Sequence, residues 1–278
     1  MERIAVVTDT GSNLSFAQAK ELGIYLLPLQ ITIDETTYQD TLEISTQDIY
    51  NELANGKMPK TSMAAYQKIY DLFEELKKDY DTIFAVPLTN GLSTNASTMQ
   101  SIARELEMNV HVIDMYATCA LEKHVAIWIK KLVDEHKSSE EILKIIQPAI
   151  DESNSLILVK NLQHLKRGGR LTPMAAALAG LLKIYPVLHI NKSTEGRIDV
   201  LNKVRTEKRA DTYAIDKIMD DIDIQHTHIY IIHSNFLEGA DHFKKCFIEK
   251  GVPEQNIHID YISSVIAVHT GLGCIAIQ

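Results

Sequence analysis

The sequence of 278 residues has few cysteines and no long apolar run. Cys119, Cys246 and Cys274 are odd in number, lie far apart and form no Cys-x-x-Cys pair, which argues against a disulfide framework or a cysteine zinc site. Lys183 and His269 interrupt the two longest apolar runs, so neither reaches the roughly 18–20 residues of a membrane-spanning helix. We therefore expect no stable membrane insertion. Unpaired thiols are typical of a reducing compartment, and a strand pattern rather than a signal peptide opens the chain, so we expect a cytoplasmic protein.

Positive charge is also scarce. Lysine and arginine number 28 against 37 acidic residues, a net charge of −9. A protein that binds nucleic acid through the phosphate backbone needs a basic face, so we expect no nucleic-acid partner. His226, His228 and His233 share a region without the spacing of a metal site, and no glycine-rich nucleotide-binding motif is present. We expect no metal and no cofactor.

Short apolar strands alternate with amphipathic helices through the first half of the chain. This alternation predicts a mostly parallel sheet with helices on both faces. The expected strands are residues 3–8, 24–33, 82–88 and 110–113, and the expected helices begin near 15 or span 46–54, 64–78, 95–107, 119–135 and 139–153.

The second half has a different pattern, in which a hairpin signal at residues 192–197 lies between strands. We predict a mixed sheet with strands at 155–159, 185–190, 198–204, 228–233, 257–261 and 274–277, flanked by helices at 206–219 and 237–250. The predicted fold class is therefore α/β with two domains, residues 1–153 and 154–278. Ligands of such folds bind between domains and at the carboxyl ends of parallel strands.

Residues 161–190 combine a basic loop, a glycine turn, a thin apolar helix and a strand. Gly168 and Gly169 suit a sharp turn or a close backbone approach. Thr172 is an expected helix N-cap and Pro173 an expected first helical residue. The helix predicted over 174–182 is rich in alanine, which is compatible with a buried core helix or with the close approach of a ligand that has a long apolar body.

The tetrapeptide Asp9-Thr10-Gly11-Ser12 matches the signature of aspartic proteases. That chemistry requires two carboxylates that share one proton, usually from two copies of the motif. The chain has no second copy, and Asp9 leads into a helix. We therefore expect Asp9 and Ser12 to satisfy backbone donors near the first helix.

Ser93 stands between a strand and a helix, as a nucleophile would in Gly-x-Ser-x-Gly. Here the second glycine is replaced by Asn95. His269 follows downstream, with Asp114 or Asp260 as the candidate acid. A lipid esterase or acyltransferase is thus one alternative, and a simple helix N-cap at Ser93 is the other.

Three loops combine hydroxyl groups or an imidazole with helix starts and glycine turns. Such donors favour an anionic group, and a buried carboxylate needs nearly every lone pair hydrogen-bonded. The loops contain Thr61 and Ser62, Ser93 and Thr94, and His269 with Thr270.

Several motifs in the same order over the whole chain resemble the DegV family, which includes the fatty-acid-binding subunits of bacterial fatty acid kinase. Leu165-Lys-Arg-Gly-Gly-Arg170 together with His269-Thr-Gly-Leu-Gly273 is the most specific pair. The others are Asp9-Thr10, Tyr38-Gln-Asp40, Lys60-Thr61-Ser62, Pro87-Leu-Thr-Asn-Gly-Leu-Ser93, Val112-Ile-Asp114 and Val204-Arg205. The resemblance implies two α/β domains around one fatty acid, with the tail buried between them.

The resemblance also assigns the candidate site. Thr61, Ser93 and His269 are the implied carboxylate ligands, and Arg170 is implied at the carboxylate mouth. Arg205 is the implied docking residue for the kinase. The implied neighbours of the carboxylate are Ser62, Thr94 and Thr270.

Three departures from the family pattern affect this assignment. Thr94-Asn95-Ala96 replaces Gly-Thr-Tyr, Met115 replaces a serine and Leu272 replaces a proline. The first change indicates that Asn95 takes part in binding the carboxylate and that the tail tunnel is wider.

The predicted function is that of a carrier without catalytic residues. It binds a long-chain fatty acid and presents the carboxylate to a partner fatty acid kinase. Burial of a long tail would contribute on the order of 10 kcal/mol, at roughly 0.8 kcal/mol per methylene, before the costs of association.

Overall fold

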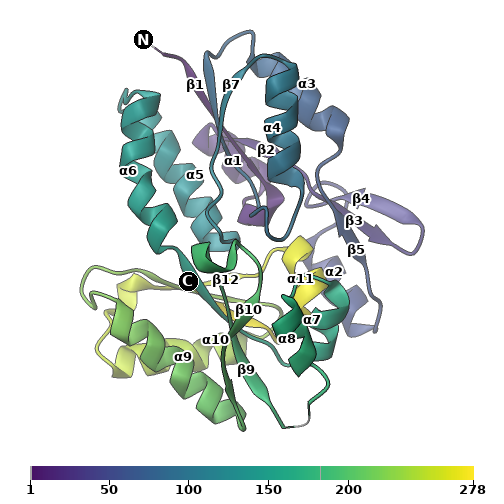
Figure 1. Ribbon diagram of the computed structural model, residues 1–278, viewed down its shortest axis with the longest axis vertical. Helices are drawn as coiled ribbons and strands as arrows, with labels where there is room; N and C mark the ends of the chain where they lie inside the picture. The colour runs from purple at the N-terminus through teal and green to yellow at the C-terminus, as the bar shows by residue number, and fades with distance from the viewer. Residues whose placement is uncertain (1, 182) are drawn as a thin grey trace.

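The computed structural model describes residues 2–181 and 183–278, which form two α/β domains stacked along the long axis of the molecule (Figure 1). The chain begins in one domain, and its other end lies at the junction between the two (Figure 1). The predicted fold class is confirmed. All strands of the larger sheet follow residue 153, and we propose 1–153 and 154–278 as the domain division.

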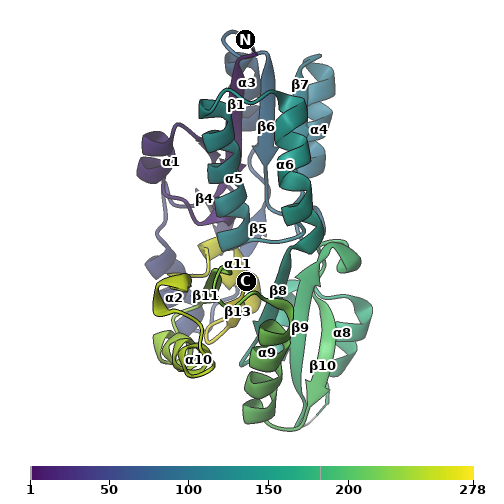
Figure 2. The ribbon, with the colours of Figure 1, turned by 90° about the vertical axis from the view of Figure 1, so that its left-hand side faces the viewer.

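The N-terminal domain is built on a four-stranded parallel sheet in the order β2-β1-β6-β7. Successive residues of β1 face opposite sides of the sheet. Val7 belongs to the core cluster that includes α3 and α4, whereas Val6 belongs to the cluster that includes α5 and α6. Helices α5 and α6 lie together on one face of the sheet (Figure 2). The elements are β1 (Ile4–Asp9), α1 (Phe16–Leu22), β2 (Tyr25–Leu27), α3 (Tyr66–Leu76), β6 (Thr82–Val86), α4 (Asn95–Glu105), β7 (Asn109–Val112), α5 (Cys119–Asp134) and α6 (Ser139–Glu152).

A small antiparallel sheet lies beside the domain junction and was not predicted. The single strand expected over 24–33 is wrong, because the chain breaks at Pro28, whose nitrogen has no hydrogen to donate. The amide of Leu29 instead donates to the Thr10 hydroxyl at 3.1 Å. The sheet, in the order β4-β3-β5, consists of β3 (Gln30–Ile33), β4 (Thr36–Gln39) and β5 (Lys60–Ser62), with α2 (Thr46–Ala54) between the last two strands.

The C-terminal domain is a six-stranded mixed sheet in the order β10-β9-β8-β13-β11-β12. Helices α9 and α10 cover its outer face, and its inner face belongs to the same core as the N-terminal domain. The elements are β8 (Asn154–Leu158), α7 (Leu162–Gly168), α8 (Pro173–Leu178), β9 (Tyr185–Asn191), β10 (Asp199–Val204), α9 (Glu207–Asp221), β11 (Ile229–His233), α10 (Leu237–Glu249), β12 (Ile257–Tyr261), α11 (Ser264–Thr270) and β13 (Ile275–Ile277).

Two segments that we expected to be loops are helices, α7 and α11, which pack against each other between the domains (Figure 1). The predicted thin helix is shorter than expected. Its first residues, Thr172 and Pro173, have the predicted N-cap and first-turn roles, but α8 ends at Leu178, two residues before Gly180, which disfavours helix. The predicted end of the helix, Leu182, lies outside the described residues.

Candidate ligand-binding site

A cavity of about 420 Å³ lies between the two domains, and we call it the head cavity. It is bounded by β5, by the loop between β6 and α4, by the segment after α7 and by α11. Its polar lining residues are Thr61, Ser62, Asn90, Ser93, Thr94, Arg170, Arg197, His269 and Thr270. Seven of the eight residues predicted to bind the ligand therefore meet here from four separate segments of the chain.

The eighth residue, Asn95, does not line the head cavity. Its side chain is fully buried behind the cavity, and its amide nitrogen donates to Asp9 at 2.7 Å. Asn95 thus supports the Ser93 loop from beneath and makes no direct contact with the cavity.

His269 is held by both of its ring nitrogens. Nδ1 lies 3.0 Å from the carbonyl oxygen of Gly168, and Nε2 lies 2.6 Å from the Thr61 hydroxyl. A carbonyl oxygen only accepts, so Nδ1 carries the hydrogen. Burial and then the charge of Arg170 lower the pKa of His269 to about 4, so the ring is neutral near pH 7. Nε2 must then accept from the Thr61 hydroxyl.

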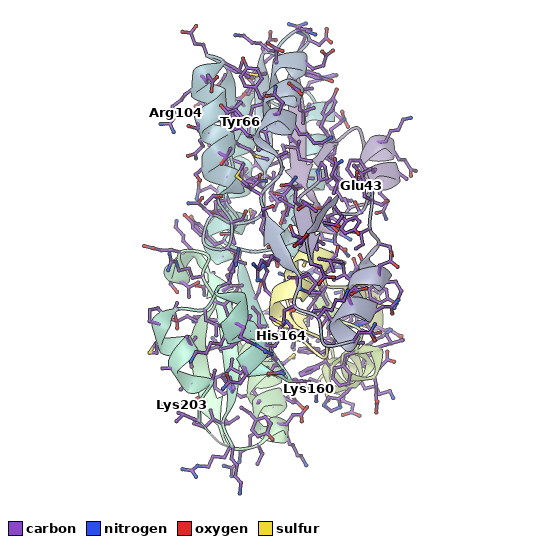
Figure 3. The ribbon with its side chains drawn as sticks, turned by 90° about the vertical axis from the view of Figure 1, so that its right-hand side faces the viewer. Glu43, Tyr66, Arg104, Lys160, His164 and Lys203 are labelled. Atoms are coloured by element: carbon purple, nitrogen blue, oxygen red, sulfur yellow. The ribbon has the colours of Figure 1, made fainter. Side chains whose placement is uncertain are left out.

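The histidine can reach this place because Gly168 has no side chain. A Cβ at Gly168 would lie 3.0 Å from Nδ1 of His269 and 3.2 Å from its Cα. Next to it, His164 on α7 is buried against α11, and its Nε2 lies 2.9 Å from the carbonyl oxygen of Val268 (Figure 3). The two most specific motifs of the sequence thus form one interlocked helix pair.

Ser93 lies in a tight turn, in which its amide and that of Leu92 donate to the carbonyl oxygen of Thr89. Its side-chain oxygen accepts from the amide of Asn95 at 3.2 Å. This interaction leaves the hydroxyl hydrogen of Ser93 able to point into the cavity. The N-cap of α4 is Thr94, one residue after the predicted N-cap, Ser93.

The Ser93 turn touches the C-terminal domain at backbone distance. A Cβ built on Gly91 would lie 2.3 Å from the carbonyl carbon of Gly196. No other residue type fits at this contact without a shift of the backbone. The two glycines therefore close one side of the head cavity across the domain junction.

The head cavity is cationic although the chain is acidic overall. Arg170 and Arg197 line it, and no aspartate or glutamate belongs to its described lining. Arg170 donates to the carbonyl oxygen of Gly168 at 2.8 Å and to that of Leu92 at 3.4 Å, which joins the domains. Burial lowers the pKa of Arg170 from its ordinary value, but a guanidinium stays charged in proteins. The cavity is suited to an anionic group.

A pair of carboxyl groups is buried directly behind this cavity. Asp9 accepts from the amides of Gly11 at 2.8 Å and Leu88 at 2.9 Å, in addition to Asn95. Glu122 on α5 is equally buried beside Asp9, and its Oε1 lies 3.3 Å from the Thr8 hydroxyl. Burial and the charge of Asp9 raise the pKa of Glu122 well above its usual range. Burial also raises the pKa of Asp9, but its three N–H donors favour the anion, so Glu122 holds the proton.

The protease-like motif is therefore structural, with Asp9 satisfying backbone donors as expected. The Ser12 hydroxyl donates to the carbonyl oxygen of Asp9 at 2.7 Å and accepts from the amide of Leu14 at 3.4 Å.

The arrangement does not form a serine hydrolase triad. The Nδ1 of His269 bonds to a backbone carbonyl rather than to a carboxylate. Asp114 accepts from the amides of Asn90 and Tyr116, and Asp260 pairs with Lys123 at 2.7 Å. Neither candidate acid orients the histidine.

A second, narrow cavity of about 20 Å³ continues from the head cavity into the core. The two cavities share Leu92, Ile198, Ile266 and Thr270. We call the second one the apolar channel; its remaining lining residues are Thr118, Cys119, Ser155, Ile157, Ile190, Ile232, Ile262, Cys274, Ala276 and Gln278. This volume holds about one water molecule, so a larger occupant requires the isoleucine side chains to move. None of the described residues of α8 lines either cavity, contrary to the interpretation of α8 as a tail-binding helix.

Sequence reasoning missed Arg197 and Glu122. Arg197 follows a glycine turn that we interpreted only as a hairpin, and its place in the cavity depends on the contact of Gly196 with the other domain. Glu122 had a readable signal, since it is a charged residue at helical spacing on the apolar face that includes Cys119 and Val125.

Arg205 does not line the head cavity. It follows β10 directly and lines a separate pocket with Lys183 and Lys203. Lys203 lies in the part of the C-terminal domain away from the domain junction (Figure 3). Among residues 2–181 and 183–278, no group of histidine, cysteine and acidic side chains could hold a metal ion. Within the same described ranges, no helix is long and apolar enough to cross a membrane.

Comparison with known proteins gives the same family along the whole chain. A family model described as "Uncharacterised protein, DegV family" matches residues 3–278. A DegV domain-containing protein (BH3627) from Halalkalibacterium halodurans is 30% identical, over 100% of this chain and 98% of its own.

Two solved structures match over 100% of this chain and 98% of their own. The fatty acid binding DegV family protein SAG1342 from Streptococcus agalactiae is 29% identical with a TM-score of 0.91. DegV from Bacillus subtilis, titled a fatty acid binding protein, is 27% identical with a TM-score of 0.87. The interlocked motifs, the two-domain fold and these full-length matches lead to one conclusion: this chain belongs to the DegV family.

Proposed function

We propose that this protein is a carrier that binds one long-chain fatty acid, with the carboxylate in the head cavity and the tail in the apolar channel. The single observation that carries the proposal is the joining of a cationic, hydroxyl-lined cavity to an apolar channel between the domains. The Streptococcus and Bacillus structures, both described as those of fatty acid binding proteins, support it.

Thr61, Ser93 and His269 are the proposed carboxylate ligands, with Arg170 nearby. The Ser93 hydroxyl can donate as the site stands. Thr61 can donate only when it no longer donates to Nε2 of His269. A carboxylate therefore favours protonation of Nε2, because Thr61 can then accept from the imidazolium and turn its hydrogen to the ligand.

The first experiment is native mass spectrometry of the purified protein, followed by denaturation and identification of any released lipid. We expect one fatty acid per chain. A protein that carries no lipid and takes up no added fatty acid under conditions in which it remains folded would contradict the proposal.

The proposed partner is a fatty acid kinase, which would transfer the γ-phosphoryl group of ATP to the carboxylate oxygen and release ADP. The carrier itself supplies no catalytic residue in this proposal, and its three free cysteines support a cytoplasmic location. Arg205, with Lys203 beside it, is the proposed docking residue.

The docking role is tested by Arg205→Ala in a reconstituted phosphorylation assay. We expect fatty acid affinity within about twofold of the wild type and at least about tenfold slower phosphorylation, the loss of about one interfacial charge pair. Lys244→Ala, on the far side of the domain, is the matched control. Equal loss of binding and phosphorylation in Arg205→Ala would show a structural role.

A further inference from the structure

The apolar channel has a polar end. It follows the inner face of the six-stranded sheet, where alternate residues of one strand face the same side. From the head cavity inward, Cys274, Ala276 and Gln278 line it in succession. Gln278 continues β13 by one residue, so it lies deepest along this strand. Thr118 and Ser155 complete this end of the channel.

The Gln278 amide makes four hydrogen bonds there. Its oxygen accepts from the amides of Ala120 at 3.0 Å and Leu121 at 3.3 Å. Its nitrogen donates to the carbonyl oxygen of Thr118 at 2.9 Å and to the Ser155 hydroxyl at 2.8 Å. Both oxygen lone pairs and both N–H hydrogens are thereby used.

These bonds also replace a missing helix cap. Helix α5 begins after Thr118, whose side chain makes no capping bond. The Gln278 oxygen caps the first turn of α5 instead, from a strand of the other domain. Displacing the amide would leave two helix N–H groups without their partner, so this end of the channel resists movement.

The isoleucine side chains along the sides of the channel are not held by hydrogen bonds. Ile157, Ile190 and Ile232 contribute apolar side chains that can change rotamer without breaking a hydrogen bond. An occupant can therefore widen the channel sideways at lower cost than it can lengthen it. On its other side, Gln278 is partly exposed to solvent.

We propose that the Gln278 side chain is the floor of the acyl channel and sets the longest tail that the protein accepts. The inference rests on the proposed fatty acid binding and adds its specificity for chain length. Because all four hydrogen-bonding positions of the amide are occupied, the floor excludes a longer tail by volume and offers no partner to a polar tail end.

The test is the affinity of the full-length protein for saturated fatty acids from decanoate to eicosanoate. Wild-type affinity should rise about fourfold per methylene, the equivalent of its transfer free energy, up to a limiting length and then stop rising. Gln278→Ala should move that limit about two carbons further, with roughly tenfold tighter binding at the new length.

Gln278→Leu is the matched control, because it keeps most of the side-chain volume but loses all four hydrogen bonds. We expect it to move the limit less than Gln278→Ala does and to lower thermal stability, because the retained volume still blocks the channel but is no longer held by hydrogen bonds. If both variants move the limit equally, the volume of the side chain does not set the length, and the inference is wrong. An unchanged limit in Gln278→Ala would overturn it as well.

Gln278→Asn keeps the amide and shortens the side chain by one methylene. It replaces the alanine variant if that variant does not fold, and an unchanged limit would then overturn the inference. If the wild-type protein binds no member of the series, the proposed function itself fails and the inference falls with it. If the wild-type protein binds fatty acids and every variant has the same length limit, the inference about Gln278 is wrong and the proposed function stands.

Discussion

Two polar groups of residues lie back to back at the carboxyl ends of β1 and β6, and they behave in opposite ways. In the buried group, Asp9 and Glu122 are both fully buried, and Asp9 accepts three N–H bonds. In the head cavity, Ser93 and His269 are only partly buried, and the Ser93 hydroxyl retains a hydrogen to donate. Asn95 separates the two groups.

The difference shows why the motif that most strongly suggests catalysis is not the site. A carboxylate whose lone pairs are occupied by backbone amides organises the chain but has little capacity for a ligand. The hydroxyls and the neutral imidazole in the open cavity have exchangeable partners. The buried group should therefore control stability, and the head cavity should control binding.

The largest expected effect is on stability in the buried group. Asp9→Ala leaves the donors of Gly11, Leu88 and Asn95 unpaired, so we expect a loss of about 3–5 kcal/mol in the free energy of unfolding. Urea unfolding measures it. Ser93→Ala is the control in the open cavity and should cost less than about 1 kcal/mol. If Asp9→Ala and Ser93→Ala lower the free energy of unfolding equally, the buried group and the head cavity do not differ in their contribution to stability.

The next largest effect is on binding in the head cavity. The double variant Ser93→Ala, His269→Ala removes two of the proposed contacts to the carboxylate, each about 1.5 kcal/mol or more, so the Kd for a fatty acid should rise about 100-fold or more. Isothermal titration calorimetry measures the change. Ser97→Ala, an exposed serine on the next turn of α4, is the control. Unchanged affinity in the double variant would disprove the ligand assignment.

The pH dependence of stability, which is smaller per pH unit than either effect above, separates the two groups by its sign. The pKa of Glu122 is raised above its unfolded value of 4.5, so its contribution to stability is complete below that pH and declines as the pH rises. Glu122→Gln removes this decline. Relative to wild type, it should gain up to about 1.4 kcal/mol per pH unit above about pH 5, measured by urea unfolding. A constant difference from pH 5 to 8 would show that Glu122 is ionised.

His269 gives the opposite sign in the same measurement. Its pKa is lowered from 6.5 to about 4, so its contribution is complete above pH 6.5 and is lost as the pH falls toward 4. His269→Gln should be less sensitive to acid than wild type over this window. A wild-type-like decline in that variant would place the acid sensitivity elsewhere.

The smallest effect is the proton linked to ligand binding. Because a carboxylate favours a protonated Nε2 on His269, binding near pH 6 should take up to about one proton. Calorimetry in two buffers of different ionisation enthalpy measures the uptake, and His269→Gln should abolish it. No buffer dependence in the wild type would mean that the neutral ring holds the carboxylate.

Much of the fold followed from local pattern. The apolar strands 4–9 and 82–86 and the helices between them were predicted within a few residues, because hydrophobic period is a local property. The break at Pro28 was readable and was missed. The small antiparallel sheet was not readable, since β4 and β5 are short and their partner is defined only by pairing.

The sequence by itself determined the family, the α/β architecture and the residue types of the head cavity, because motifs such as Leu165-Lys-Arg-Gly-Gly-Arg170 are contiguous. Only the tertiary structure decided which of these residues line the head cavity and which are buried behind it. It placed Asn95 behind the cavity, added Arg197 to it and paired Glu122 with Asp9. The physical reason is that burial, charge neighbours and hydrogen-bond partners come from segments far apart in the chain, 86 residues in the case of Asn95 and Asp9, and no local pattern encodes such a contact.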